Sequence, residues 1–357
     1  MSDGWLRRRG PPHGCTGYGA SIQRTGGERV ASVELGDPEL ERVVTEGMRA
    51  SEELLIHELS QGEEFLVEHV RHLADAGGKR FRPMFAMLSA QFGPRPDADD
   101  VVTAATVIEM THLATLYHDD VMDEADMRRG VPSANARWSN SVAILSGDYL
   151  FATASRLLAR LGTDTVAHFA RTFGELVTGQ MRESIGCPEG ADEVEHYLQV
   201  IREKTGVLIA SSGHLGALHA GADEKTVEAL SRYGGLVGLV FQIVDDIIDI
   251  ASDSAQSGKT PGTDLREGVF TLPVLYALRE EGPIGDRLRE ILVGPVTDDE
   301  VLAEALDLLE RSTGPQQALG LVRELMEEAE AVIADLPEIP AKAALRRVAD
   351  YTVERVG

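Results

Sequence analysis

The chain has 357 residues, 43% of them hydrophobic, and a formal net charge of −25. This length supports a sizeable core in one large domain or two ordinary ones, and the negative charge argues against a nucleic-acid partner, because phosphate backbones bind basic surfaces. Only two cysteines, no readable secretory signal and no apolar run long enough to span a membrane occur. We therefore expect a soluble cytoplasmic protein without a transmembrane segment.

A leader of 33 residues precedes the first helical pattern. It is rich in Gly, Arg, Ser and Thr and lacks apolar periodicity, which is typical of a disordered segment. From Pro38 onward, apolar residues recur at intervals of three and four. We expect residues 1–33 to be disordered and residues 34–357 to form a single all-helical domain.

A short basic segment follows the second helical pattern. Gly77 and Gly78 end that pattern and permit backbone conformations with positive φ. Lys79, Arg80 and Arg82 come next, at the junction with another helix. Cationic side chains combined with the free N–H groups of a helix start form a natural anion site. The alternative is a solvated basic turn.

Hydrophobic periodicity predicts that nearly all of the remaining chain is helical, with almost no strand-like alternation. Expected helices cover roughly 63–75, 98–124, 140–161, 164–186, 191–220, 224–252, 267–281, 298–311, 314–335 and 338–355. The stretches 101–117 and 236–250 are apolar almost all round, as helices enclosed by other helices are. The Gly-containing break over 252–268 is a candidate mobile flap.

Two of the predicted helices carry the same acidic pattern. Asp119, Asp120 and Asp123 end one apolar helix, and Asp245, Asp246 and Asp249 repeat the spacing on another. The first and last aspartates of each set share a helix face, where like charges are destabilising. Two such faces predict a shared cluster of Mg²⁺ ions, which prefer few carboxylates, water and substrate phosphates. Arg128 and Arg129 lie close enough in sequence to reach those phosphates.

Five motifs together resemble the trans-polyprenyl diphosphate synthase family, of the long-chain actinobacterial type. They are GGKRFRP at 77–83, HDDVMDEADMRRG at 118–130, KTG at 204–206, FQIVDDIID at 241–249 and GKTPGTD at 258–264. The resemblance implies an all-α isoprenoid-synthase bundle around a central cavity. It also implies a homodimer that joins isopentenyl diphosphate head-to-tail to an allylic diphosphate, with three Mg²⁺ ions in each active site.

The resemblance also implies a role for each motif residue. Metal binding, direct or supporting, would fall to Asp119, Asp120, Asp123, Asp245, Asp246 and Asp249. Isopentenyl diphosphate would be held by Lys79, Arg82, His112 and Arg129. The allylic diphosphate would be held by Arg128, Lys204 and Lys259. The catalytic group would comprise Lys204, Thr205, Gln242 and Lys259, with Thr205 and Gln242 facing the carbocation.

Residues upstream of Asp119 bear on product length. Ala114 and Thr115 stand one helical turn before it, followed by Thr111, Ile108 and Ala104, none of them aromatic. One turn advances about 5.4 Å, comparable to one extended isoprene unit. This favours a long product, such as the side chain of a respiratory quinone.

Other interpretations stay open at this point. Leu150 or Phe151 could instead floor the cavity, which would give a medium product near four isoprene units. A terpene cyclase would need neither the second aspartate set nor a second diphosphate site. A non-catalytic partner subunit would be expected to have lost some of the six aspartates, and a cation-buffering helical protein would bind Mg²⁺ without diphosphate.

Overall fold

The computed structural model describes residues 34–251 and 261–354, so the predicted leader, Lys259 and most of the predicted flap lie outside the described residues. The helices and strands follow one another as α1 (Pro38–Leu59), α2 (Glu64–Asp75), α3 (Phe81–Ala90), α4 (Asp99–Met122), β1 (Met127–Arg128), β2 (Val131–Pro132), α5 (Ala134–Arg137), α6 (Asn140–Leu158), α7 (Thr163–Ile185), α8 (Glu193–Ile201), the π-helix η1 (Arg202–Gly206), α9 (Val207–His219), α10 (Glu224–Ala251), α12 (Thr263–Glu267), α13 (Leu272–Leu278), α14 (Pro283–Ile291), α15 (Asp299–Arg311), α16 (Gly314–Ile333) and α17 (Pro340–Glu354).

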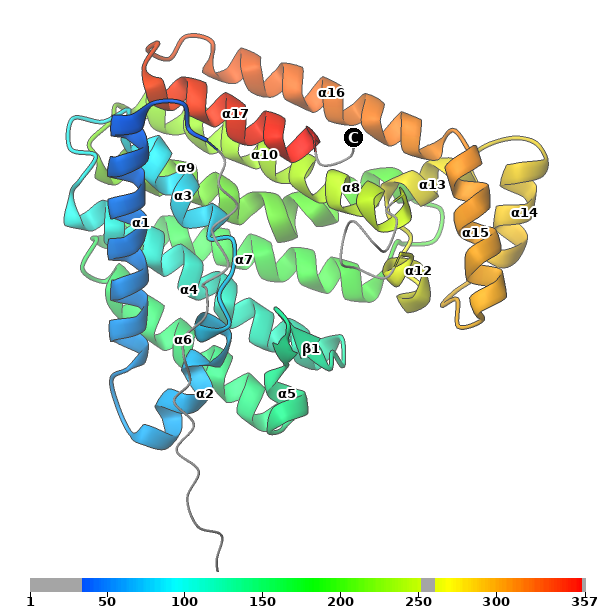
Figure 1. Ribbon diagram of the computed structural model, residues 1–357, viewed down its shortest axis with the longest axis horizontal. Coiled ribbons are helices and arrows are strands. Elements are labelled where there is room, and N and C mark those ends of the chain that lie inside the picture. Colours follow the sequence, from blue (N-terminus) through cyan, green and yellow to red (C-terminus); the bar gives the residue numbers. More distant parts are fainter. Residues whose placement is uncertain (1–33, 252–260, 355–357) are drawn as a thin grey trace, which may run out of the picture.

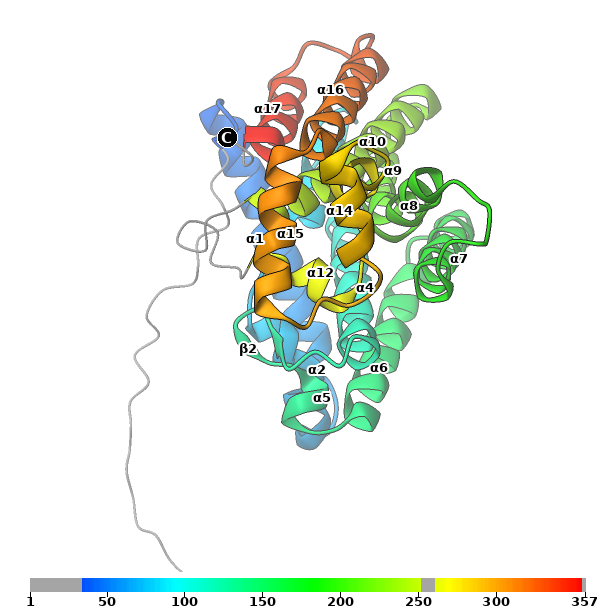
Figure 2. The same cartoon turned by 90° about the vertical axis from the view of Figure 1, so that its right-hand side faces the viewer.

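These helices form a layered bundle, which confirms the predicted all-α class (Figure 1). α4 packs against α1, α3, α6 and α9, while α10 packs against α9, α16 and α17. The pair α14 and α15 lies at one end of the bundle in Figure 1, and in Figure 2, where that end faces the viewer, it lies in front of the other helices. The two predicted apolar helices, α4 and α10, are therefore enclosed by others, as their composition indicates.

Burial along α4 explains why its sequence is apolar on every side. Val101, Ile108, Leu113 and Tyr117 are all fully buried, although they point in different directions around the helix. Because each of these faces meets a neighbouring helix, a single apolar stripe would not be enough. α4 thus reaches its acidic C-terminal turn through the middle of the molecule.

Two glycines let α9 pack closely between α3 and α10. A Cβ atom on Gly213 would lie 2.4 Å from the carbonyl oxygen of Leu230, and one on Gly216 would lie 2.2 Å from that of Ala86. Any larger residue would push the helices apart. The start of α9 is thereby held against α10, where both contribute to the site described below.

The structure differs from the sequence predictions in four local details. The predicted helix 191–220 is interrupted by η1. The predicted helix 267–281 is shortened to α13, and α12 lies within the predicted break 252–268. No helix was predicted where α14 lies, because Gly282 and Pro283 resemble a break; in the structure Gly282 has a φ of 107° and Pro283 opens the helix. A two-stranded hairpin, β1 paired with β2, was also missed because its strands are only two residues long.

Among residues 34–251 and 261–354, no helix combines the length and apolar character needed to cross a membrane.

A stacked pair of histidines joins α7 to α9. The rings of His168 and His214 have centroids 3.9 Å apart and are nearly parallel, and His168 Nε2 lies 3.1 Å from Ser211 Oγ. Burial, followed by the neighbouring His214 and Arg171, lowers the pKa of His168 from 6.5 to about 4. The folded protein therefore favours the neutral form of this imidazole.

We expect this histidine to make the protein less stable in acid. Between pH 6.5 and pH 4 the unfolded chain takes up a proton at this residue and the folded chain does not, so the free energy of unfolding falls as the pH drops through that window. In His168→Gln the fall should be smaller. Urea unfolding at pH 4.5 and pH 7.5 checks this, with His57→Gln on the exposed side of α1 as control. Equal acid sensitivity in all three proteins would contradict it.

Candidate active site

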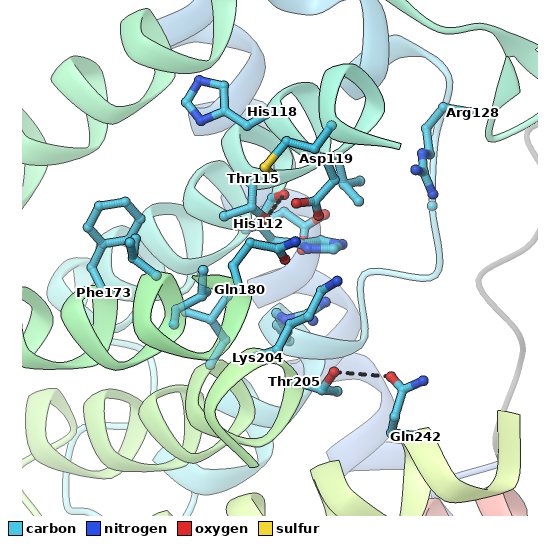
Figure 3. A pocket seen from close by; sticks show the side chains of 18 of the residues that line it. His112, Thr115, His118, Asp119, Arg128, Phe173, Gln180, Lys204, Thr205 and Gln242 are labelled. Atoms are coloured by element: carbon cyan, nitrogen blue, oxygen red, sulfur yellow. Dashed lines mark hydrogen bonds between the residues drawn. The ribbon is translucent and has the colours of Figure 1, made fainter. Parts of the chain in front are cut away.

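A cavity of about 1010 Å³ opens among α3, α4, α6, α7, η1, α10 and the β1–β2 hairpin (Figure 3). Charged and polar side chains line one part of it, and apolar side chains line the rest. The residues predicted from the sequence that line it are Lys79, Arg82, His112, Thr115, Asp119, Arg128, Arg129, Lys204, Thr205, Gln242 and Asp245. Segments almost 170 residues apart in the sequence, from Lys79 to Asp245, therefore meet around one space.

The first acidic set divides between the cavity and the protein interior. Asp119 lines the cavity, whereas Asp120 has a fully buried side chain whose Oδ1 accepts a hydrogen bond from Arg128 Nε at 2.6 Å. Asp123 is the C-cap of α4 and is exposed. Burial raises the pKa of Asp119 from 3.8 to about 6, even though Lys204 opposes the shift. The nearby cations Lys204 and Arg128 thus do not fully offset the cost of burying the ionised carboxylate of Asp119.

The second acidic set divides in the same way. Asp245 lines the cavity. Asp246 points toward α8, where its Oδ2 accepts a hydrogen bond from the hydroxyl of Tyr197 and its Oδ1 accepts one from Gln242 Nε2 at 3.0 Å. Asp249 accepts the backbone N–H of Asp264 at 3.3 Å, which ties α10 to α12. Burial raises the pKa of Asp246 to about 7.

The carboxylates fit a divalent cation that also binds a substrate. Asp119 and Asp245 supply oxygen ligands from two helices to the same cavity, and Asp120 Oδ2 is buried without a hydrogen-bond partner among the described residues. In the part of the chain that the structure describes, no three His, Cys, Asp or Glu side chains are grouped to hold one metal ion. Asp119 and Asp245, one carboxylate from each of two helices, suit Mg²⁺, which prefers few protein ligands completed by water and phosphate.

A cationic cluster lies beside the first acidic set. Arg82 from α3, His112 from α4 and Arg129 from the hairpin all line the cavity, together with Lys79. Arg82 Nε is buried and has no hydrogen-bond partner among the described residues. Burial, followed by the nearby arginines, lowers the pKa of His112 well below 6.5. Positive charge gathered in this way, with donors left over, suits a polyanion such as a diphosphate.

Glu109 and Glu52, which the sequence analysis did not identify, form ion pairs that support this cluster. Glu109 is only 2% exposed and pairs with Arg80 Nη1 at 2.9 Å and with Arg129 Nη2 at 3.8 Å. Arg80, predicted as part of the anion site, also forms a bidentate pair with Glu52 at 2.7 and 2.8 Å. Arg80 and Arg129 both have left-handed backbone conformations, with φ of 49° and 54°. Such strain persists where surrounding contacts fix it, as these ion pairs do.

The π-helix η1 presents the KTG motif to the cavity. A π turn inserts an extra residue into the helix and commonly occurs at functional sites. Lys204 Nζ donates to Glu183 Oε2 of α7 at 2.5 Å, and Thr205 Oγ1 donates to Gln242 Oε1 at 3.0 Å (Figure 3). Glu183 was not predicted either, because nothing in the sequence pairs it with Lys204 across 21 residues.

The apolar part of the cavity is walled by aromatic and aliphatic side chains. Phe151 of α6 and Phe173 of α7 have ring centroids 4.3 Å apart, and both line the cavity together with Thr115. The other residues predicted to bear on product length do not line it. They are Ala114, which is buried in a cluster shared with α6, Thr111, whose hydroxyl donates to Val107, and Ile108, which packs against Ala104 and Leu215.

Comparisons with known proteins agree with this geometry. The family model described as polyprenyl synthetase matches residues 63–309, more than half of the chain. A nonaprenyl diphosphate synthase of Mycobacterium tuberculosis (strain ATCC 25618 / H37Rv) is 56% identical over 334 residues, covering 94% of this chain and 100% of that protein.

Solved structures give the same result. A geranylgeranyl pyrophosphate synthase from Corynebacterium glutamicum, complexed with calcium and isoprenyl diphosphate, has a TM-score of 0.83 and 60% identity, covering 90% of this chain and 99% of that chain. A decaprenyl diphosphate synthase from Rhodobacter capsulatus has a TM-score of 0.81 and 33% identity, covering 89% and 99%. The resemblance drawn from the five sequence motifs is confirmed. The chain belongs to the polyprenyl synthetase family, a family of enzymes that transfer prenyl groups.

Proposed function

We propose that this protein condenses isopentenyl diphosphate head-to-tail onto an allylic diphosphate and makes an all-trans polyprenyl diphosphate. The observation that carries the proposal is one cavity with two separate anchors for anions and an apolar section beyond them. The anchors are the cationic cluster of Lys79, Arg82, His112 and Arg129, and the carboxylate pair of Asp119 and Asp245. Two diphosphates side by side each need their own countercharge, and the hydrocarbon chain needs the apolar wall.

Each anchor would have its own substrate. The cationic cluster would hold isopentenyl diphosphate directly, since arginine matches phosphate geometry. Asp119, Asp123 and Asp245 would hold Mg²⁺ on the allylic diphosphate, and Asp120, Asp246 and Asp249 would have supporting or water-mediated roles. Arg128, Lys204 and Lys259 would be further contacts of that diphosphate. When bound, Mg²⁺ would neutralise the charge that develops on the departing diphosphate. Three ions per site remain part of the proposal.

The reaction would follow from this placement. The C1–O bond of the allylic diphosphate breaks and its electron pair leaves with the diphosphate, so that an allylic cation forms. The double bond of isopentenyl diphosphate then attacks C1, and a proton leaves the adjacent carbon to the released diphosphate. Thr205 and Gln242 would face the cation with their oxygen atoms, while Phe151, Phe173 and Leu208 would exclude water.

A long product is the form of this proposal that the relatives favour. The nonaprenyl diphosphate synthase of M. tuberculosis and the decaprenyl diphosphate synthase of R. capsulatus carry long-chain names. The name of the geranylgeranyl pyrophosphate synthase of C. glutamicum corresponds to the alternative, a medium-length product. Phe151, one of the two residues that could form the cavity floor for a medium-length product, does line the cavity. Leu150, the other candidate floor, is buried in the cluster beside Ala114.

A single incubation tests both the reaction and the product length. The protein is mixed with labelled isopentenyl diphosphate, farnesyl diphosphate and Mg²⁺, and the products are extracted as alcohols and separated by length. Elongated products that require Mg²⁺ are expected. No condensation would refute the proposed reaction, and products that stop at twenty carbons would refute the long-chain form. Mg²⁺ binding without dependence on diphosphate would favour a cation-buffering protein instead.

Thr115→Phe should shorten the product by at least about one isoprene unit, because one helical turn spans about 5.4 Å and the new ring would enter the cavity one turn before Asp119. Turnover of short allylic substrates should continue, since no diphosphate contact is lost. Chromatography of the extracted alcohols measures the change. Thr103→Phe adds the same ring near the other end of α4, away from the cavity, and should leave product length unchanged. An unchanged distribution in Thr115→Phe would contradict the proposed tail path.

Homodimerisation is also part of the proposal. α6 and α7 expose Leu145, Met181 and Ile185 by 66%, 58% and 78% respectively. Met181 and Ile185 also line the cavity, so a second copy seated there would close its apolar side. Leu145→Glu should shift the protein toward monomer in sedimentation velocity. Val293→Glu, at a site 84% exposed between α14 and α15, should not. A monomeric unmodified protein would refute the dimer without touching the reaction.

A further inference from the structure

A chain of hydrogen bonds runs from α8 through α10 to η1. The Tyr197 hydroxyl donates to Asp246 Oδ2, Gln242 Nε2 donates to Asp246 Oδ1 at 3.0 Å, and Thr205 Oγ1 donates to Gln242 Oε1 at 3.0 Å. Thr205 and Gln242 line the cavity, whereas Tyr197 and Asp246 do not. Tyr197 therefore reaches Thr205 through a chain of hydrogen bonds that passes by way of Asp246 and Gln242.

This chain fixes which end of the Gln242 amide faces the cavity. The NH₂ group of Gln242 donates to Asp246 Oδ1 and its carbonyl oxygen accepts from Thr205, so the NH₂ group points toward Asp246 and the carbonyl oxygen toward Thr205. Both oxygens of Asp246 are occupied by donors from the protein. If the tyrosine hydroxyl were lost, one buried carboxylate oxygen would have no donor and the carboxylate could rotate, which would release the amide.

Close packing prevents η1 from adjusting on its own. A Cβ atom on Gly238 of α10 would lie 2.8 Å from the Cα of Gly206 at the end of η1. At the other side of η1, Glu203 accepts hydrogen bonds from Arg182 Nε at 3.0 Å and from Gln199 Nε2 at 2.6 Å. The backbone of η1 therefore holds Thr205 in place. The orientation of the Gln242 amide then depends on its hydrogen bond to Asp246, which in turn accepts from Tyr197.

We propose that Tyr197 is a positioning residue for the condensation, which orients Asp246 so that Gln242 presents its carbonyl oxygen, and not its NH₂ group, to the reacting carbons. The inference rests on the proposed function, in which a carbocation forms beside Thr205 and Gln242. An oxygen dipole stabilises such a cation and an N–H dipole destabilises it. Tyr197 does not line the cavity and so contacts neither diphosphate, and its role is exerted on the chemical step through Asp246 and Gln242.

Tyr197→Phe removes only the hydroxyl and keeps the partly buried ring. We expect kcat to fall about 10-fold or more, as for the loss of a hydrogen bond to a charged group, while KM for both diphosphates stays within about 2-fold. Tyr233→Phe is the control, because it removes the same hydroxyl from a buried tyrosine whose hydroxyl donates to the carbonyl of Leu345, and neither residue lines the cavity. The control should lose similar thermal stability and keep its kcat. Wild-type kcat in Tyr197→Phe, or an equal loss in Tyr233→Phe, would overturn the proposal.

A double variant tests whether Tyr197 acts through Gln242. Once Gln242→Ala has removed the amide, adding Tyr197→Phe should cost little more activity; losses that multiply would overturn the proposal. A measurement independent of turnover follows the side-chain amide signals of Gln242 by NMR. They should stay sharp and single in Tyr233→Phe and broaden or double in Tyr197→Phe, and unchanged signals in Tyr197→Phe would also overturn it. Failure of the proposed function appears separately, as absence of condensation by the unmodified protein.

Discussion

Replacing Asp119 by alanine should lower kcat/KM at least about 1,000-fold. Metal-assisted neutralisation of a leaving group is worth several kcal/mol, and about 4 kcal/mol corresponds to a factor of 1,000. Asp119 is the member of the first acidic set that lines the cavity, whereas Asp120 is held inside by Arg128. Asp245→Ala, its counterpart on α10, should have the same effect. Steady-state assays across a range of Mg²⁺ concentrations measure both.

The same substitution should not weaken the fold. Burial raises the pKa of Asp119 from 3.8 to about 6, so at pH 7.5 the folded protein carries a carboxylate that is more costly than in the unfolded chain, by up to about 3 kcal/mol. Removing it should leave the melting temperature at pH 7.5 unchanged or higher, with full helical circular dichroism. Asp126→Ala, at an exposed position before the hairpin, is the control and should keep its activity. Substantial activity in Asp119→Ala would contradict the metal assignment, and a lowered melting temperature would contradict the pKa argument.

Most of the fold could be predicted because its helices are long and strongly periodic. α4 and α10 are apolar on every face, which identified them as enclosed helices before any contact was known. Short elements gave no such signal. α14 begins at Pro283, directly after Gly282, and no helix was predicted there. η1 differs from an α-helix by one extra residue in a turn, which no hydrophobic pattern records.

Residues of the candidate site could be predicted when they belong to a recurring motif, and they were missed when they do not. Asp119 and Asp245 were identified because two helices repeat the same acidic spacing, and both line the cavity. Glu109, Glu183 and Tyr197 were missed, since each stands alone on its helix among ordinary neighbours. Their importance comes from the partners that folding brings to them, namely Arg80, Lys204 and Asp246 respectively. Pairings over tens of residues in sequence leave no local pattern to read.

Arg80, the N-cap of α3, and Arg82, in its first turn, offer the sharpest separation of substrate binding from stability. Arg82→Ala should raise KM for isopentenyl diphosphate about 100-fold, which is about 2.7 kcal/mol, with little change in KM for the allylic substrate. Arg82 lines the cavity, its Nε is buried without a hydrogen-bond partner among the described residues, and burial lowers the pKa of its guanidinium. Its charge is therefore costly in the free protein, and removing it should leave the melting temperature unchanged or raise it.

Arg80→Ala should show the opposite balance. Arg80 donates to Glu52 and Glu109, and its loss would leave Glu109 buried with only Arg129, at 3.8 Å, close to its carboxylate. Breaking a buried ion pair from one side costs about 3 kcal/mol or more, so the melting temperature should fall by about 5 °C or more. Differential scanning fluorimetry and substrate titration on the two variants test this contrast. If Arg80→Ala kept its stability, or Arg82→Ala lost stability and kept its KM, the division would fail. If both expectations hold, Arg80 is held by glutamates of the protein, and Arg82 is available to bind the substrate.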